Sequence, residues 1–409
     1  MSPPRPTRPP TAAFIALLAL LTGLGQFGNN VFLPGLPALA DRFGLTIEQA
    51  TLSYSVYLAV FGLGQLAAGP ITDRFGRRRL GGLAAIVFAL GSLMAATATS
   101  FQALLLGRIL QASGAAATLV ISRAVARDLY EGEALRRVLA TVMIVFALVP
   151  GFSPLIGGAL TQFAGWRAAL LFSALVGLGG GIWTLVRLPA DGPGISHRSS
   201  SSLRVYARLL ADPNFLAPVL LCAAAIASIS AFFGVSPALF LRGLGISPLE
   251  YGLYTPLVVA GFVIGSLAVR RFGVGRSDAT VIGWGLAVQV LGCALLILPP
   301  ALGHLGLGQM IAAMLVFVTG LGIVHPSASA AAMSARPDHA GHAAALLGFA
   351  QMSLGALGTL LGSVLFARWP ELGMQLAMAS FTIAALVLAA TTASRSSRSG
   401  RSTPDRRAP

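Results

Sequence analysis

Charged residues are scarce in this 409-residue sequence, where they make up 10% of the chain while hydrophobic residues make up 56%. Soluble domains carry about 25% charged residues. A chain with so few charges cannot cover a water-exposed surface with polar side chains, so the composition excludes an ordinary soluble protein. It indicates instead a protein that is surrounded by a lipid bilayer.

Cysteine is rare and lysine is absent. Each of the two cysteines, Cys222 and Cys293, lies inside an apolar run, so we expect no disulfide framework and no cysteine-ligated metal site. All 28 basic residues are arginines, and they are spread over many short polar segments. The net charge of +15 therefore does not indicate nucleic-acid binding.

Motifs of membrane enzymes and of ATP-driven pumps are also missing. The sequence has no His-Glu-x-x-His, no Gly-x-Ser-x-Gly, no paired acids inside an apolar run and no Gly-rich nucleotide loop. We therefore expect no enzyme activity, no metal and no cofactor. A membrane enzyme or a receptor remains the alternative from another functional class.

Long apolar runs are what the sequence has in abundance. A run of about 20 residues crosses a ~30 Å hydrocarbon core as a helix. The runs predict an all-α membrane protein with twelve transmembrane helices in two pseudo-symmetric six-helix bundles. The predicted spans are residues 11–33, 49–69, 80–98, 101–122, 138–160, 166–188, 214–241, 250–269, 279–298, 308–333, 342–366 and 373–393.

A polar segment rich in Ser and Arg separates the sixth run from the seventh, and its composition is typical of a linker. The C-terminal residues are too poor in apolar side chains to fold alone. The predicted parts are a cytoplasmic tail at 1–10, a six-helix bundle at 11–188, a cytoplasmic linker at 189–213, a second bundle at 214–393 and a disordered cytoplasmic tail at 394–409.

The distribution of arginines predicts the orientation, because cytoplasmic loops of membrane proteins collect basic residues. With both termini inside, most arginines face the cytoplasm, and only Arg42, Arg167, Arg242 and Arg368 fall outside. We therefore expect a multi-pass protein of the cytoplasmic membrane with both termini in the cytoplasm.

The two halves share a pattern at their second helix. One begins with Thr46 and Gln49 and the other with Ser247 and Glu250, which are capping-box pairs, and both end in an Arg-Phe-Gly triplet. Internal repeats of this kind are typical of secondary transporters. Chance similarity between two helical hairpins is the alternative.

The segment GPITDRFGRRR joins the second and third predicted helices. It resembles the signature cytoplasmic loop of the Major Facilitator Superfamily, and the resemblance implies that its acid and basic residues latch the outward-facing state. An ordinary arginine-rich cytoplasmic loop is the alternative. The latch residues that the resemblance implies are Gly69, Asp73, Arg74, Gly76, Arg77 and Arg78.

Arg108 stands in the otherwise apolar segment LLLGRILQASGAAA. A charge inside a membrane span is costly, so it should face a partner or a cavity. The segment resembles the fourth-helix motif of the same superfamily, which implies a role for Arg108 and Gln111 in proton handling. The alternative is an arginine that reaches the outer membrane interface.

The fifth helix carries VPGFSPLIGGAL, in which prolines remove backbone hydrogen bonds and glycines permit close helix contact. This segment resembles the motif that marks antiporters in the superfamily, although Gly and Pro are common in membrane helices generally. The residues of this antiporter helix are Pro150, Gly151, Pro154, Gly157 and Gly158.

Three further segments, NNVFLPGLPALADRFG, GWR and HPSASAAAMSARPDHAGHAAALLGFAQ, are similar to drug exporters of the bicyclomycin and chloramphenicol resistance type. The resemblance runs from Phe14 to Leu388. It breaks at Asn29 and Asn30, where that type usually has an acid in helix one. No acidic residue falls in mid-membrane, which puts the usual carboxylate coupling in doubt.

His325 is the one histidine inside a predicted span, and its ordinary pKa near 6.5 suits reversible protonation. A structural histidine is the alternative. Substrate-binding candidates are amides and aromatics, which suit apolar ligands with a few polar groups, although ordinary packing explains any single aromatic. The candidates are Asn29, Asn30, Tyr54, Tyr57, Phe232, Phe233, Tyr254 and Gln351.

These observations predict a secondary transporter that exports small lipophilic compounds by alternating access, as a monomer and with the proton as coupling ion. Without a mid-membrane carboxylate, neutral or anionic substrates are favoured over cations. Export or exchange of a metabolite or sugar is the alternative within the same fold.

Overall fold

The computed structural model describes residues 11–188, 202–302 and 306–399, apart from the side chains at 70, 73–75, 202, 203 and 393–399. Within this part of the chain, twelve helices are long and apolar enough to cross a membrane. The predicted all-α fold with twelve spans is therefore confirmed.

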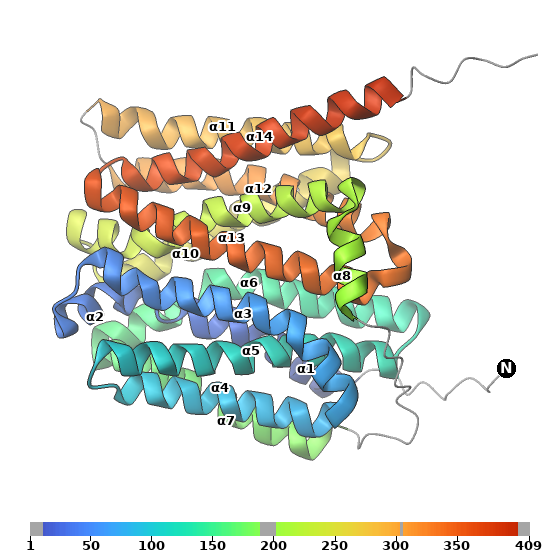
Figure 1. Ribbon diagram of the computed structural model, residues 1–409. Helices are drawn as coiled ribbons and strands as arrows, with labels where there is room; N and C mark the ends of the chain where they lie inside the picture. Colours follow the sequence, from blue (N-terminus) through green and yellow to red (C-terminus); the bar gives the residue numbers. More distant parts are fainter. Residues whose placement is uncertain (1–10, 189–201, 303–305, 400–409) are drawn as a thin grey trace, which may run out of the picture.

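The helices form two groups, α1–α7 and α9–α14, that lie side by side (Figure 1). The first group contains α1 (Ala12–Asn30), η1 (Leu33–Gly35), α2 (Leu36–Phe43), α3 (Ile47–Phe75), α4 (Arg77–Thr97), α5 (Phe101–Leu129), α6 (Gly132–Ala164) and α7 (Trp166–Arg187). The second contains α9 (Pro213–Ala238), η2 (Leu239–Gly243), α10 (Pro248–Phe272), α11 (Asp278–Ala301), α12 (Leu307–Ala335), η3 (Pro337–His339), α13 (Ala340–Arg368) and α14 (Gly373–Ser399).

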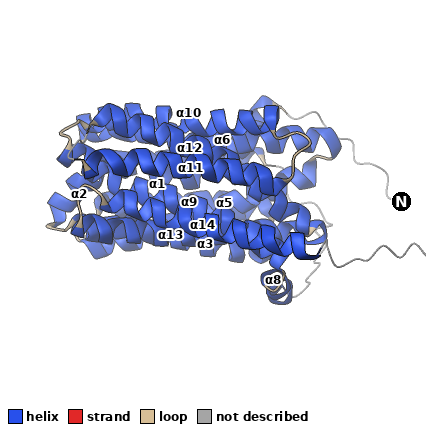
Figure 2. Cartoon of the chain, turned by 90° about the horizontal axis from the view of Figure 1, so that it is seen from above, coloured by secondary structure: helices blue, strands red, loops and turns tan. Residues whose placement is uncertain are grey.

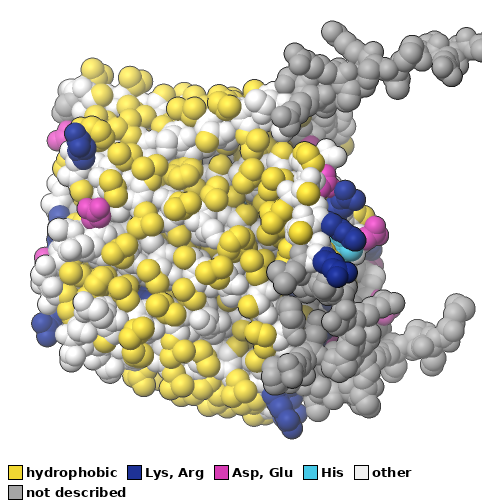
Figure 3. All heavy atoms as spheres, viewed as in Figure 1, with side chains coloured by type: hydrophobic (Ala, Val, Ile, Leu, Met, Phe, Trp, Pro, Cys, Tyr) yellow, Lys and Arg dark blue, Asp and Glu magenta, His cyan; other side chains and the backbone are white. Residues whose placement is uncertain are grey.

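The ends of the spanning helices define two faces. The proximal face is the one where α1 begins and α14 ends, and the distal face, at the opposite end, carries α2 and η2 (Figure 1). Charged side chains gather toward the two faces, and hydrophobic side chains cover the surface between them (Figure 3). This is the distribution expected of a protein that spans a bilayer.

Helix α8 (Ser202–Leu210) lies within the segment that the sequence analysis assigned to a linker. Figures 1 and 2 together show that it lies against one side of the bundle near the proximal face, at right angles to the spanning helices, where it contacts α9 and α13. Val205 and Leu209, one turn apart, are buried, while Arg204 and Arg208 are exposed. The helix is therefore amphipathic and is held in place by its apolar face.

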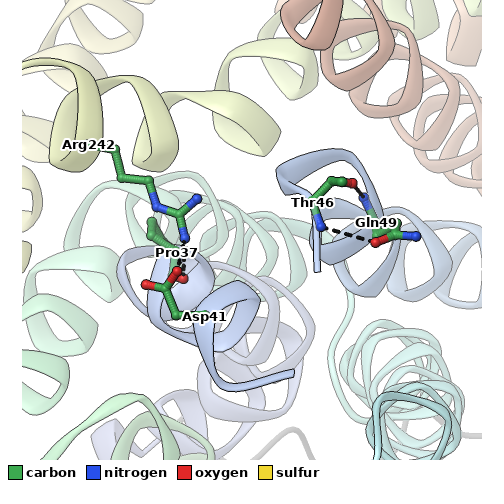
Figure 4. Close-up of polar contacts among 5 residues, drawn as sticks. All are labelled: Pro37, Asp41, Thr46, Gln49 and Arg242. Carbon is green, nitrogen blue, oxygen red and sulfur yellow. Dashed lines mark hydrogen bonds and ion pairs between the residues drawn. The ribbon is translucent and has the colours of Figure 1, made fainter. Parts of the chain in front are cut away.

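Two capping boxes begin α3 and α10. The hydroxyl of Thr46 accepts from the backbone N–H of Gln49 at 3.2 Å, and the Gln49 side chain accepts from the N–H of Thr46 at 3.0 Å (Figure 4). Ser247 and Glu250 make the same pair at 3.2 and 2.7 Å. Both boxes lie at the distal face, so the repeated sequence pattern builds the same helix start in each half.

Other boundaries differ from the prediction. The first span breaks after Asn30 and continues as η1 and α2, because prolines follow in this stretch, and the seventh span ends in the π-helix η2. The last helix continues to Ser399, whereas residues from 394 onward were expected to be disordered. Polar composition alone does not stop a helix that is already nucleated.

Helices α4 and α5 pack with their backbones in direct contact. A Cβ atom added at Gly107 would lie 2.6 Å from the backbone nitrogen of Ala95 and 2.9 Å from the carbonyl oxygen of Gly91. Small residues allow such close approach in membranes, where helix association depends on van der Waals packing. In contrast, Gly179 on α7 has open space around it.

We predict that Gly107→Val forces α4 and α5 apart and destabilises the protein by about 1–3 kcal/mol, the usual cost of overpacking. Thermal unfolding of the purified protein in detergent measures this as a lower Tm. Gly179→Val is the matched control and should leave Tm almost unchanged. Equal Tm values for the two variants would contradict the close packing described.

Candidate functional site

Arg108 of α5 is completely buried, and its guanidinium is held by neutral oxygens from three helices. Nη1 donates to the carbonyl oxygen of Gly28 at 2.8 Å and to Oε1 of Gln111 at 2.6 Å. Nη2 donates to Oδ1 of Asn29 at 2.6 Å, and Nε donates weakly to the carbonyl oxygen of Ser53 at 3.4 Å. Arg108 therefore does not reach toward the membrane interface, and the alternative considered from the sequence is excluded.

Two aromatic rings cover the same guanidinium. Its central carbon lies 4.3 Å from the ring centre of Tyr57 and 5.2 Å from that of Phe32. The face of an aromatic ring attracts a cation. Tyr57 is itself fixed by a hydrogen bond from its hydroxyl to the carbonyl oxygen of Gly25 at 2.8 Å. The charge is thus stabilised by oxygens and rings, without an acidic residue in ion-pair contact.

The amides around Arg108 extend the network to α4. Gln111 donates from Nε2 to the hydroxyl of Ser92 at 2.8 Å, which fixes the direction of its amide. Asn29 and Asn30 are each 1% exposed, and in both the second polar atom, Nδ2 of Asn29 and Oδ1 of Asn30, is buried without a partner. Buried unsatisfied polar atoms are rare in native proteins, so each of these two atoms is a place where a water molecule or a ligand could bind.

His325 lies in the other half, in α12, next to Gln351 of α13. The two Nε2 atoms are 3.1 Å apart, and the His325 ring centre is 6.1 Å from that of Phe262. Cys222 of α9 contacts the carbonyl oxygen of His325 at 3.5 Å. The sequence analysis did not single out Cys222 for a site, because nothing in its apolar run marks it as a neighbour of the histidine.

Helix α6, whose glycines and prolines the sequence analysis compared with the antiporter motif, lies between its own half and the other. A methyl group at Gly157 would overlap the carbonyl oxygen of Val31, and one at Gly158 would overlap that of Pro248 in α10. Gly151 is also in contact with α10, since its carbonyl oxygen accepts from Thr255 at 2.8 Å. Pro150 and Pro154 both lie inside α6, in the same stretch.

Contacts between the halves continue to the distal face. Arg242 of η2 donates to Oδ1 of Asp41 and to the carbonyl oxygen of Pro37, at 2.6 and 2.9 Å (Figure 4). The side chain of Gln162 accepts from the first-turn N–H of Leu249 at 3.2 Å. We call this set of five residues the distal clasp. The sequence analysis placed Arg242 and Asp41 at the outer boundary but could not pair them.

The residues of the latch loop are only partly described. Gly76 has φ +84°, which favours glycine, and joins α3 to α4. Arg77 forms a 2.6 Å ion pair with Asp128 at the end of α5, and Nε of Arg78 donates to the carbonyl oxygen of Leu185 at 2.7 Å. Gly69 lies within α3, while the side chains of Asp73 and Arg74 are outside the described residues.

The predicted substrate residues fall into two sets. One set is buried, namely Asn29, Asn30, Tyr54, Tyr57, Phe232 and Phe233. Phe232 packs edge-on against Phe233 and Phe240, at ring distances of 5.6 and 6.1 Å, so these aromatics form part of the apolar core. The other set, Tyr254 and Gln351, keeps partial exposure, as does His325.

The fold and the buried arginine together define a helical membrane transporter. The Major Facilitator Superfamily model matches residues 18–359. The chain therefore belongs to the Major Facilitator Superfamily, and it is a multi-pass membrane transporter for small molecules, not an enzyme.

Similar proteins agree with this assignment. The chain is 30% identical to a chloramphenicol resistance protein of Pseudomonas aeruginosa, covering 86% of this chain and 83% of the relative. It is 28% identical to a bicyclomycin resistance protein homolog of Haemophilus influenzae, covering 87% and 90%. The resemblance noted in the sequence is confirmed.

Solved structures show the same fold. A bacterial homolog of the human lysosomal transporter Spinster, in an inward-facing and occupied conformation, superposes with a TM-score of 0.74 at 16% identity, covering 93% of this chain and 96% of that one.

We predict that Gln111→Met destabilises the protein by about 1.5–3 kcal/mol, the usual contribution of a hydrogen bond to a charged group, because Arg108 then lacks one of its acceptors. Chemical unfolding in detergent measures the change. Ser113→Ala on the same helix is the control, since the hydroxyl of this exposed serine donates only to the carbonyl oxygen of Ile109, one turn earlier in α5. A loss no larger than that of the control would show that Gln111 does not hold the arginine.

Proposed function

We propose that the protein exports small lipophilic compounds, including drugs, from the cytoplasm as a proton antiporter. The names of its similar proteins, which refer to chloramphenicol and bicyclomycin resistance, support such substrates. The single observation that carries the direction of transport is the glycine and proline stretch of α6, which resembles the antiporter motif of the superfamily and packs against α1 on one side and α10 on the other. A helix with this contact can slide or tilt as the halves move.

The proximal face, in this proposal, is the cytoplasmic one. The exposed Arg204 and Arg208 of α8 and the arginines at the start of α4 lie there, as basic residues of cytoplasmic loops do. The hydrogen bonds between described residues of the two halves lie from mid-helix to the distal face. Alternating access then requires the distal clasp to open when substrate is released outside.

His325 is the candidate for proton coupling. In the structure, the amide nitrogen of Gln351 faces Nε2 of His325, so this ring nitrogen accepts when the imidazole is neutral. Protonation makes Nε2 a donor, and the Gln351 amide must then rotate to present its oxygen. Proton uptake would thus change a contact between α12 and α13. Arg108, in contrast, stays charged and acts through substrate or through α1.

We predict that expression in a drug-hypersensitive host raises tolerance to chloramphenicol and related lipophilic compounds.

In reconstituted vesicles, His325→Ala should abolish transport driven by a pH gradient while leaving substrate binding intact. His339→Ala, which removes an imidazole from η3 at the proximal face, is the matched control. If pH-driven transport persisted unchanged in His325→Ala, the histidine would have no coupling role.

Export of a metabolite or sugar is the second candidate, because the same fold carries such substrates. The two functions give different results in one culture experiment. A metabolite exporter would leave drug tolerance unchanged and alter the composition of the medium.

We predict that weakening the distal clasp shifts the protein toward states open at the distal face. Asp41→Asn should have a small effect, since an exposed ion pair contributes about 0–1 kcal/mol, and Arg242→Gln a larger one, because it also removes the bond to Pro37. Distances between spin labels placed on α2 and η2 measure the shift.

The control for the clasp is Arg368→Gln at the same face, whose guanidinium lies over Trp369 of its own half. Distance distributions that stay identical in Arg242→Gln and in the wild type would show that the clasp does not hold this state.

A further inference from the structure

Helix α5 carries three arginines that pair with no described carboxylate. Arg108 is the eighth of its 29 residues, nearer the distal face, and Arg123 and Arg127 follow toward the proximal face. None of the three forms an ion pair with a described acidic residue. The hydrogen-bond partner of Arg123 is the sulfur of Met143, at 3.8 Å. Asp128, the acid at the end of α5, is paired with Arg77.

This row of arginines borders the other half. Arg127 lies near Gly341 at the start of α13, since a Cβ atom added at Gly341 would be 4.0 Å from Nη1 of Arg127. Met143, the partner of Arg123, belongs to α6, which packs against α10. A molecule that moved between the halves from the proximal face toward Arg108 would come near Arg127 and Arg123. Charges of one sign along a low-dielectric path concentrate ions of the opposite sign.

The surroundings of Arg108 leave hydrogen-bond donors available. Its guanidinium has five N–H groups, and four bonds to neutral oxygens are present, so one N–H of Nη2 is left over. Nδ2 of Asn29 is a second buried donor without a partner, on the same amide whose oxygen already accepts from Nη2. Because that oxygen must face the arginine, the orphan atom of Asn29 is the donor nitrogen.

An anion is the ligand that fits both the unneutralised charge of Arg108 and the two free donors beside it. Its charge would neutralise the guanidinium, which otherwise contacts only neutral oxygens and aromatic rings, and its oxygens would accept hydrogen bonds from the free N–H groups. A cation would meet a like charge in a medium of low dielectric constant. His325 of α12, in the other half, is neutral or positive, so it adds no negative charge.

We propose that the transporter selects lipophilic organic anions. Arg108 and the amide nitrogen of Asn29 bind the anionic group, and Arg123 and Arg127 attract the anion as it enters from the proximal face. This rests on the proposed export function and names the charge class of its substrates.

The test uses three probes with one aromatic scaffold and different charge: 1-naphthoate, 1-naphthamide and 1-naphthylmethylammonium. Equilibrium binding of each tritiated probe to purified full-length protein gives three Kd values. The wild type should bind naphthoate at least about tenfold more tightly than the ammonium compound, a ratio typical of one partly buried charge contact, with the amide between them.

Asn29→Asp places a carboxylate on Arg108 without changing side-chain size. It should raise the Kd for naphthoate about tenfold and remove or reverse the preference over the ammonium probe. Gln111→Glu places a carboxylate next to the same guanidinium from α5 and should likewise raise the Kd for naphthoate and remove the preference. The test can therefore still be made if one of the two variants does not fold.

Arg123→Gln should weaken naphthoate binding about threefold, and more at low salt. Arg208→Gln is its matched control, since this exposed arginine of α8 lies away from the row, and it should change nothing.

Kd values within threefold of one another for the three probes in the wild type, or an unchanged preference in both acidic variants, would overturn the proposal. Chloramphenicol export is measured separately. Export without naphthoate binding would overturn the anion selection and leave the proposed function standing. Naphthoate binding in the expected order, without export of any compound, would overturn the proposed function and retain the anion site.

Discussion

One buried guanidinium, that of Arg108, organises the N-terminal half of the transporter. A charged group inside a bilayer protein is stable only where it finds hydrogen bonds and polarisable neighbours. Here the partners come from α1, α3 and α5, so these helices are held together inside the bundle by one side chain. The carbonyl oxygen of Gly28 and the side chain of Asn29, near the end of α1, both accept from it. Just beyond, the chain leaves α1 and continues as η1 and α2.

The contacts between the halves are of a different kind. At α6 and α10, glycines let backbone meet backbone, and few side chains must rearrange when the helices shift. At the distal face, the clasp of Arg242 with Asp41 and Pro37 is polar and largely solvent-accessible, so it is easily broken. The interface thus combines close but non-interlocking packing with weak polar contacts, which would suit the alternating access proposed above.

Much of the fold could be predicted from the sequence, because in lipid the length and polarity of a segment nearly decide its structure. The twelve spans, the two capping boxes and the burial of Arg108 follow from local residue types. Pairings between residues far apart in the sequence do not follow from local residue types. The contacts of Arg108 with Asn29 and of Arg242 with Asp41 depend on how the helices pack. Helix α8 was missed because it is only nine residues long and follows directly on a polar segment rich in Ser and Arg, with which it was counted as linker. The placement of the substrate candidates, the bundle boundaries and the role of the latch stay predictions.

The most direct test of alternating access is to join the two halves across the distal clasp. Cysteines at positions 41 and 242, bridged by a short reducible bis-methanethiosulfonate linker, would hold the distal face closed, while Cys222 and Cys293 are buried. The account predicts that bridged protein in vesicles stops exporting chloramphenicol and that reduction restores export. Undiminished export by fully bridged protein would show that substrate does not leave between the halves at this face.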